Sequence, residues 1–473
     1  MEVISIYFPA LVIISAFFYY FLDNKYRKSL LTILSCAFLA TLSINLLAYV
    51  LVYSLINYFL GLSIYNTRFK KAIFRTGIII NLLQIIVLKY YGFTIDPILG
   101  LFGLDSGISR LTEILAPIGI SYFTLQAIGY LVNIYMGWEK PERNILDLVL
   151  YLSFFPKFLS GPVERSNHFL AQVKNQRATN SQNIITGLKI ALLGFFKKVI
   201  IADQLAPLVT NMYNTPDSFG GSYILLAIIV QPLYLYFDFS GYTDIAIGFA
   251  RIYGIDLIQN FNRPFLAENV TNFWKRFHIS LTSWFNDYVF KQVSFRFRKL
   301  KSYASIIAVF VTWILFGIWH GAGWNFMVLG LIQAVAIIYE YFTKKERGLL
   351  FSRLPGSMKI WVGRLFTYLF YGWSLTFFFS ADLPSTFKLF SKIKDLSNFS
   401  LGTTPLIPFI FGLSVSLLYL VFEILQNDSS AAYGWLKRYW TNHRALRIIV
   451  YYTVIAMIIT QLSGSSSFVY QIF

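Results

Sequence analysis

Charged residues are scarce in this 473-residue chain: they form 13% of the sequence, whereas hydrophobic residues form 56%. A soluble domain carries about 25% charged residues. The shortage excludes an ordinary soluble protein. Apolar runs of roughly 20 residues, the length of helix that crosses a bilayer, recur along the chain. The composition therefore predicts an all-α polytopic membrane protein.

Cysteine is nearly absent as well, since Cys36 is the single one and an intrachain disulfide is excluded. The sequence also lacks a cluster of metal ligands, a phosphate-binding glycine loop and a Gly-x-Ser-x-Gly nucleophile motif. We therefore predict no metal site and no bound cofactor. No internal repeat is found, although transporters often carry one.

Acidic residues are few, at 22 against 40 basic ones, which gives a net charge of +18. The basic residues lie mostly in short loops between apolar runs, as the positive-inside rule describes for cytoplasmic loops. The charge thus indicates a membrane topology and not a nucleic-acid partner. The basic loop Asn24–Lys28 follows the apolar run Val3–Leu22, which places the N-terminus outside.

We expect one integral membrane domain over residues 1–473, with 11 to 12 crossings, both termini outside and lipid all around it. Its N-terminal spans lie within residues 3–95, a motif-bearing core covers about 116–330, and the C-terminal spans lie within 359–463. Residues 29–66 hold no charge and are long enough to predict two back-to-back spans.

Two stretches depart from a simple span. The run Ile145–Phe155 is too short to cross and predicts a re-entrant or interfacial segment. Thr186–Val209 predicts a helix interrupted by Lys197 and Lys198, whose ammonium groups we expect to snorkel to the cytoplasmic interface.

His320 is the strongest candidate catalytic residue. It lies at the junction of two apolar runs, where an ionisable group is costly and usually marks function. The glycines beside it allow close approach of backbone or ligand, and Trp319 and Trp324 shield the position from water. A neutral imidazole in such a setting is a competent general base near pH 7. The alternative is a histidine bound to a backbone carbonyl at a helix end.

His278 has two equally supported interpretations. It lies on an amphipathic basic stretch beside Lys275 and Arg276, so it is either a second functional histidine or an interfacial residue that faces lipid headgroups.

Several polar residues accompany the two histidines as possible orienting or substrate-contacting groups. Asn325 either orients His320 or stabilises an oxyanion. Asp238 and Asp244 lie on one predicted helix, where structural pairing is preferred and a basic partner near His278 is possible; Asp287 is a similar case. A basic cytoplasmic collar of four residues would suit the phosphates of an anionic substrate or an acidic protein face, although positive-inside topology alone would also produce it: Lys157, Arg165, Lys275 and Arg276. Lys157 and Arg165, with Lys174 and Arg177, would face anionic headgroups or an anionic substrate.

Six ordered motifs resemble the membrane-bound O-acyltransferase (MBOAT) family, in particular its bacterial branch of alginate O-acetylation and D-alanyl-teichoic-acid transfer proteins. They are Ala116–Gln126, Phe154–Pro162, Tyr236–Gly248, Asn260–Phe265, Phe273–Leu281 and Trp319–Phe326. The chain departs from the alginate-type pattern after Asp287-Tyr288, where Val289–Arg298 replaces a glycine-containing turn. The departure argues against alginate itself as the acceptor.

The resemblance implies an MBOAT-like helical bundle with a central tunnel, with His320 as the catalytic histidine and His278 as the second motif histidine. It implies transfer of an acyl group, preferably acetyl, from a cytoplasmic thioester such as acetyl-CoA to a hydroxyl acceptor. It further implies O-acetylation of an extracytoplasmic polysaccharide through a separate acetyltransferase-like partner, in a bacterial cytoplasmic (inner) membrane. The alternatives are D-alanyl transfer from a carrier protein to teichoic acid and, in another class, a transporter or flippase.

Overall fold

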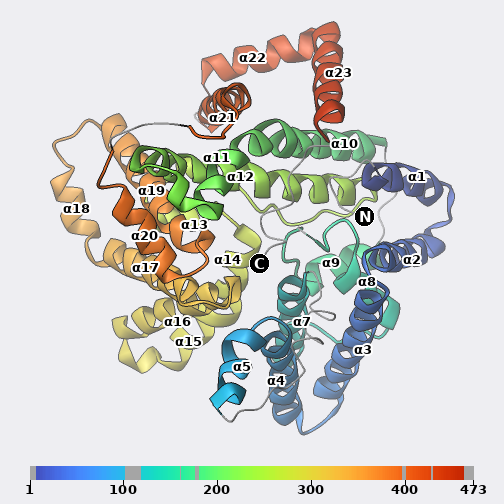
Figure 1. Cartoon of the computed structure of the whole chain (residues 1–473). Coiled ribbons are helices and arrows are strands. Elements are labelled where there is room, and N and C mark those ends of the chain that lie inside the picture. The colour runs from blue at the N-terminus through green and yellow to red at the C-terminus, as the bar shows by residue number, and fades with distance from the viewer. Residues whose placement is uncertain are drawn as a thin grey trace. The chain divides into compact units, whose positions relative to one another are not determined.

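The protein is described here by a computed structural model, which covers residues 7–101, 119–159, 161–175, 181–396, 401–427 and 430–462. Within these ranges the chain is helical, and its only β-type pairing is an isolated bridge between Phe261 and Phe277. The predicted all-α class is confirmed. The helices form two compact units, which are described separately (Figure 1).

The first unit contains residues 1–191, 243–259 and 284–288. Its helices within the described residues are α1 (Tyr7–Phe21), α2 (Asn24–Leu42), α3 (Ile44–Asn66), α4 (Lys70–Leu88), α5 (Tyr91–Leu101), α7 (Ile120–Tyr135), α8 (Ile145–Ser153), α9 (Ser166–Lys174) and most of α10 (Ser181–Phe195). Residues 29–66 lie in two consecutive helices, α2 and α3, of which α3 is among the helices long and apolar enough to cross a membrane and α2 is not, so the prediction of two spans is confirmed for one of them only. At Ser43, between the two helices, the side-chain hydroxyl accepts the backbone N–H of Leu46 at the start of α3.

Aromatic rings form the centre of this unit. Phe8 of α1 packs edge-on against Phe38 of α2 and Phe155, with ring centroids 5.3 and 5.9 Å apart. Tyr253 closes the cluster on Phe155 at 5.9 Å, and its hydroxyl lies 2.6 Å from that of Ser15. Edge-to-face pairs stabilise such a cluster beyond the area that they bury.

The second unit contains residues 192–242, 260–283 and 289–473. It begins with the π-helix η1 (Phe196–Ala202), α11 (Asp203–Asn214), η2 (Pro216–Ser218) and the long α12 (Gly221–Ile252), whose last turns belong to the first unit. Short elements follow: η3 (Pro264–Leu266), α13 (Val270–Trp274), α14 (Ile279–Phe285), η4 (Asn286–Phe290), α15 (Lys291–Arg296) and η5 (Arg298–Leu300). The end of α14 and most of η4, residues 284–288, belong to the first unit.

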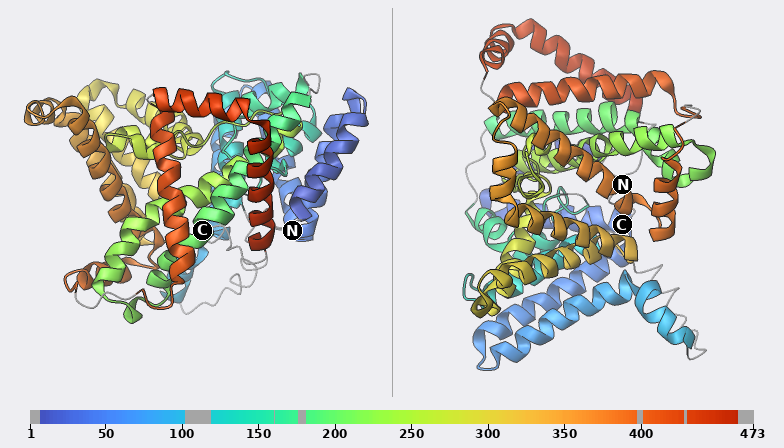
Figure 2. Two further views of the ribbon diagram at one scale, coloured as in Figure 1. Left: turned by 90° about the horizontal axis from the view of Figure 1, so that it is seen from above. Right: turned by 90° about the vertical axis from the view of Figure 1, so that its left-hand side faces the viewer.

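The remaining helices of the second unit, in chain order, are α16 (Ser302–His320), α17 (Trp324–Phe342), α18 (Lys344–Leu350), α19 (Gly356–Phe379), α20 (Leu383–Lys392), α21 (Leu406–Asn427), α22 (Ala431–Asn442) and α23 (Arg444–Gln461). Helices α16 and α17 form a tight hairpin. Helix α22 lies across the ends of α21 and α23 (Figure 2).

Seven helices in the described part of the chain are long and apolar enough to cross a membrane: α3, α4, α12, α16, α17, α21 and α23. The apolar α1 is shorter, at 15 residues. Large apolar side chains such as Phe17 and Ile407 are exposed on these helices, as expected of a surface that faces lipid. The protein is a multi-pass membrane protein. The total of 11 to 12 crossings, the orientation of the termini and the single domain stay predictions.

The short apolar run after residue 144 forms α8, whose nine residues are too few to cross a bilayer. Its position relative to the membrane stays a prediction. Motif residues Ala116–Ile118 and Ser160 lie outside the described residues, as does Arg177.

The expectation for Lys197 and Lys198 is wrong, because both are buried instead of snorkelling to an interface. The Lys198 ammonium lies 2.7 Å from a carboxylate oxygen of Asp203 and 2.6 Å from one of Asp238. The pairing joins η1 to α12, since Asp238 belongs to α12. Asp238 therefore pairs structurally inside the unit, as preferred, but with a lysine of η1 and not with a basic residue near His278.

This buried ion pair generates the first prediction. Lys198→Met leaves two buried carboxylates without their shared cation, a change that costs about 3–5 kcal/mol when one partner of a buried pair is removed. We expect a large fall in the midpoint of thermal unfolding, measured by fluorescence on the detergent-purified protein.

Lys388→Met is the matched control. Lys388 pairs at 2.7 Å with Asp217, whose side chain is 70% exposed, and exposed pairs contribute little. Equal midpoints for the two variants would contradict the structural role of the buried pair.

Candidate active site

His278 lies between α13 and α14 in a left-handed backbone conformation, with φ of +52°. Such a conformation is uncommon for a residue other than glycine and costs of order 1–3 kcal/mol unless its surroundings impose it. Backbone pairing on both sides imposes it here. The N–H of Asn262 donates to the Arg276 carbonyl, and the N–H of Ile279 donates to the Asn260 carbonyl, each at 2.9 Å.

The imidazole of His278 is buried, with 1% of the residue exposed. Its Nδ1 lies 3.2 Å from Oδ1 of Asn260, and Phe239 of α12 meets the ring edge-on with centroids 4.7 Å apart. Burial lowers the pKa of His278 to about 3, so the ring is neutral at physiological pH. The alternative of an interfacial residue that faces headgroups is therefore wrong.

The segment that carries His278 is held to the long helices by buried polar contacts. Glu340 of α17 accepts hydrogen bonds from the first backbone N–H groups of α13, at Val270 and Thr271. Gln333, about two turns before Glu340 on α17, accepts from the Trp274 indole at 3.0 Å and donates to the Ser374 hydroxyl at 3.0 Å. These contacts fix a stretch of short helices that has little regular structure of its own.

His320 is the last residue of α16 and is 4% exposed. Its ring packs against three aromatic rings, with centroid distances of 4.7 Å to Phe316, 4.9 Å to Trp319 and 5.3 Å to Phe378. The imidazole therefore has an apolar wall that limits the access of water. Of the two tryptophans expected to shield it, Trp319 lies against the ring, whereas Trp324 is 62% exposed. Phe378 was not identified from the sequence, because it lies 58 residues beyond His320 in an unremarkable apolar run.

The structure brings the two histidines into one cluster. The Trp319 indole contacts the His320 ring and also lies 6.2 Å, between centroids, from the His278 ring. Two buried imidazoles thus flank a single indole within the second unit. Imidazole is the side chain best suited to accept and return protons near neutral pH, so the cluster is suited to general acid–base chemistry.

Asn325 uses its side-chain amide nitrogen for contacts within the second unit. The side chain is fully buried, and its Nδ2 donates to the carbonyls of Phe377 at 3.0 Å and Ser380 at 2.8 Å. Both amide hydrogens are thereby used at the end of α19, where helix carbonyls lack intrahelical partners. Asn325 thus binds the turn of α19 that carries Phe378, whose ring packs against His320. Its role as an orienting or oxyanion-binding residue stays a prediction.

The other candidate residues lie in varied settings. Trp324 is 62% exposed, Lys275 is exposed, and Arg276 is half-buried with its Nε donating to Asn272 Oδ1 at 3.2 Å. Asp244 and Asp287 belong to the first unit; Asp244 is half-buried, and Asp287 pairs with Arg165 at 3.6 Å. A substrate contact for any of these stays a prediction.

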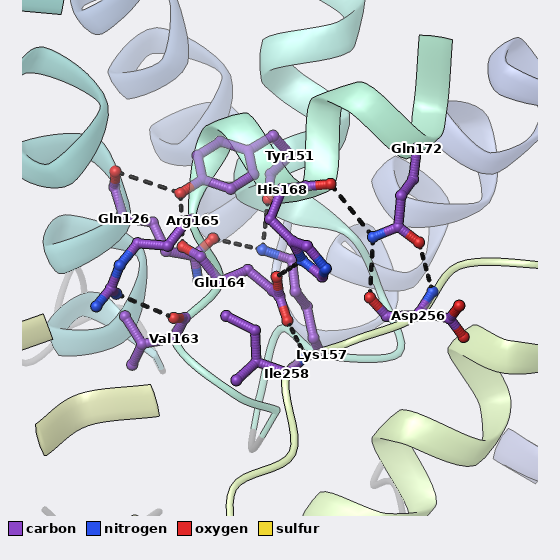
Figure 3. A network of polar contacts seen from close by, with 10 residues as sticks. All are labelled: Gln126, Tyr151, Lys157, Val163, Glu164, Arg165, His168, Gln172, Asp256 and Ile258. Atoms are coloured by element: carbon purple, nitrogen blue, oxygen red, sulfur yellow. Dashed lines mark hydrogen bonds and ion pairs between the residues drawn. The ribbon is translucent and has the colours of Figure 1, made fainter. Parts of the chain in front are cut away.

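Lys157 does not belong to a basic collar, because it is 2% exposed inside the first unit. Its ammonium donates to the Tyr151 carbonyl at 2.6 Å and to Oε1 of Gln126 (Figure 3). Burial lowers the pKa of Lys157 to about 7. The expectation that this residue faces headgroups or an anionic substrate is wrong.

A buried carboxylate lies in the same network. Glu164 accepts from the backbone N–H of Ile258 and lies 2.9 Å from Nδ1 of His168 (Figure 3). The hydrogen bond from His168 to Glu164 raises the pKa of that histidine. This network joins the loop after α8, α9 and the segment after α12, which indicates a structural role within the first unit.

A metal site is not indicated in the described ranges, where no three or more His, Cys, Asp or Glu side chains are grouped so as to hold an ion.

Comparison with known proteins identifies the family. The model of the membrane-bound O-acyltransferase (MBOAT) family matches residues 139–381, which include both histidines and the helices around them. The chain belongs to the MBOAT family. Its motif Ala116–Gln126 precedes the matched region.

Curated bacterial relatives of this family member share about a third of its residues. The probable alginate O-acetylase of Azotobacter vinelandii is 33% identical over 320 residues, which cover 66% of this chain and 63% of the relative. The peptidoglycan O-acetyltransferase of Helicobacter pylori is 32% identical over 378 residues, covering 73% and 69%. The teichoic acid D-alanyltransferase of Bacillus subtilis is 33% identical over 242 residues, covering 48% and 60%. The match thus spans slightly less than two thirds of the Azotobacter relative's length.

The hairpin that ends at His320 depends on glycine. A Cβ added to Gly317 of α16 would lie 2.2 Å from the Phe326 carbonyl oxygen, and one added to Gly330 of α17 would lie 2.2 Å from that of Trp313. These are backbone atoms, so the two MBOAT helices must separate to admit a methyl group. We predict that Gly317→Ala and Gly330→Ala each lower stability by about 1–3 kcal/mol, the usual cost of overpacking, in thermal unfolding.

Gly348→Ala in α18 is the control, because no atom lies within 4 Å of the added Cβ. It should be neutral or slightly stabilising, since alanine favours a helix over glycine. Unchanged stability of both hairpin variants would contradict the close packing of α16 on α17.

Proposed function

We propose that the protein is a membrane O-acyltransferase in which His320 is the general base. The observation that carries this proposal is the pair of buried imidazoles around Trp319, within the region that matches the family. Burial beside aromatic rings keeps competing water away from a reactive acyl group. Membership of the family supplies the reaction class, and the cluster supplies groups suited to it.

In the proposed reaction the acceptor hydroxyl gives its proton to His320 while its oxygen attacks the carbonyl carbon of an acyl thioester. A C–O bond forms, the C–S bond breaks, and the thiolate leaves and recovers the proton from the imidazolium. The base contributes about 10²–10⁴-fold in such reactions. Asn325 is not assigned as the oxyanion donor, because its amide hydrogens bind carbonyls of α19.

Acetyl is the proposed acyl group. The alignment with the peptidoglycan O-acetyltransferase covers 73% of this chain, whereas that with the teichoic acid D-alanyltransferase covers 48%. We further propose acetyl-CoA or another cytoplasmic acetyl thioester as the donor and an extracytoplasmic polysaccharide as the final acceptor. We propose that a separate acetyltransferase-like partner outside the membrane completes the transfer. We also propose that the protein lies in the bacterial inner membrane with both termini outside.

D-alanyl transfer from a carrier protein is the second candidate, because the Bacillus subtilis D-alanyltransferase is as similar in the aligned region as the alginate relative.

Removal of the base tests the mechanism. His320→Ala should lower acetyl transfer to the exported polymer or to a surrogate alcohol by about 10²–10⁴-fold, with an unchanged unfolding midpoint. His443→Ala is the matched control, because His443 is an exposed histidine between α22 and α23 and should keep full activity. Near-normal transfer by folded His320→Ala would exclude the general-base role.

The identity of the donor and the transporter alternative are tested together in proteoliposomes. Acetyl-CoA labelled with ¹⁴C in the acetyl group and ³H in the nucleotide is supplied on one side, with the alcohol acceptor on the other. We expect ¹⁴C alone in the acceptor. Movement of both labels would indicate transport of the whole molecule, and transfer only from a D-alanyl carrier protein would favour the second candidate.

A further inference from the structure

A single oxygen atom beside His278 receives three polar groups. Oδ1 of Asn260 lies 3.2 Å from Nδ1 of His278, 3.1 Å from the backbone nitrogen of Ser280 and 2.9 Å from the Ser280 hydroxyl. Asn260 has no exposed surface, so these contacts are made away from water. The sequence identified Asn260 as part of a motif but gave it no role.

The backbone N–H of Ser280 decides the orientation of the Asn260 amide. A backbone nitrogen is always a donor, so the side-chain atom that faces it must be the oxygen and not the NH₂ group. That oxygen accepts hydrogen bonds and has no proton to give. The His278 nitrogen that faces the same oxygen must therefore carry the proton.

We propose that Asn260 is a positioning residue that holds His278 as the Nδ1–H tautomer and leaves the lone pair on Nε2. In this state Nε2 can accept a proton or a hydrogen bond, but it cannot donate one. His278 then serves as an acceptor for a hydroxyl or water in the active site and not as a donor to the oxyanion. The tautomer is a property of the folded protein, whereas its use in acyl transfer rests on the proposed function.

Backbone geometry supports the proposal, because Asn260 also holds the main chain of His278 in place. The Asn260 carbonyl accepts the N–H of Ile279 at 2.9 Å, directly after the left-handed His278. Asn260 thus fixes the backbone on one side of His278 and the ring nitrogen on the other. A carboxylate or carbonyl that binds the second nitrogen of a working histidine orients the ring in the same manner in other proteins.

Burial of His278 supports the proposal because it favours the neutral form of the ring. The desolvation that lowers its pKa to about 3 keeps the ring neutral, and only a neutral imidazole has a tautomer to select. A neutral amide partner fits this state, whereas a carboxylate in place of Asn260 would attract a second proton to the ring.

The tautomer can be observed directly by NMR of the whole protein labelled with ¹⁵N- and ¹³C-histidine, since the chain has four histidines. The His278 signals are those lost in His278→Gln. At pH 7 we expect a pyrrole-type Nδ1 and a pyridine-type Nε2. A pyridine-type Nδ1, or an imidazolium, overturns the proposal whatever the protein catalyses.

Three variants test the role of Asn260 in the reaction. Asn260→Ala removes the acceptor, so we expect a mixture of tautomers and a kcat about 10–100-fold lower with little change in KM, the usual loss when the partner of a working histidine is removed. Asn260→Asp keeps an acceptor oxygen and should restore the Nδ1–H proton, with a higher His278 pKa in the NMR titration. Asn262→Ala is the control: its side chain is exposed and its backbone contact survives.

The outcomes separate this inference from the proposed function. If the wild-type protein shows the Nδ1–H tautomer but transfers no acyl group, the proposed function fails and the tautomer stands. If the wild-type protein is active and folded Asn260→Ala keeps both the tautomer and kcat, Asn260 does not position His278. Should Asn260→Ala not fold, the wild-type spectrum and Asn260→Asp still decide the proposal.

Discussion

The candidate active site depends on the hydrogen bonds between Asn260 and the His278 segment. One residue binds the main chain after His278 through its carbonyl and the imidazole through its side-chain oxygen. These bonds hold His278 in a left-handed backbone conformation that histidine does not favour by itself. The backbone conformation of His278 in turn places its ring edge-on to Phe239 and near the Trp319 indole.

The same physical constraint shapes the rest of the protein: a polar group away from water needs a partner within the chain. Lys198 lies between two carboxylates, Lys157 donates to a carbonyl and an amide, and Asn325 binds two carbonyls at the end of α19. Three of the contacts join elements that are distant in sequence: Lys198 with Asp238, Lys157 with Gln126, and Asn325 with the carbonyl of Ser380. Polar contacts also place the short helices: α13 is held to α17 by Glu340 and Gln333, and α14 is held by the bond between Ser280 and Asn260.

Packing around His320 follows a different rule. In the α16–α17 hairpin, backbone atoms of each helix occupy the space that a side chain at Gly317 or Gly330 of the other helix would need. The two glycines therefore allow the helices to approach closely. His320 at the end of α16 packs against Phe378, and Asn325 of α17 binds the Ser380 carbonyl two residues after Phe378. Two histidines with different backbone settings thus converge on one aromatic cluster.

Much of the fold was predictable. Helical class, the membrane environment and most helix positions follow from apolar runs, because the bilayer length and the need to satisfy backbone hydrogen bonds leave few alternatives. The burial of His320 was predictable from its position between two apolar runs, whereas its catalytic role stays a prediction. The motif residues around His278 indicated the family, which the match over residues 139–381 confirms.

The sequence by itself determined the class of the protein and its candidate histidines, because apolar length, loop charge and local motifs are properties of neighbouring residues. Only the tertiary structure decided which polar residues are buried and with what partners. Lys157, Lys198 and His278 resemble surface residues in their local basic surroundings, yet all three are buried. Their burial depends on contacts with residues distant in sequence, such as Asp238 for Lys198 and Gln126 for Lys157, and local periodicity carries no information about such pairs.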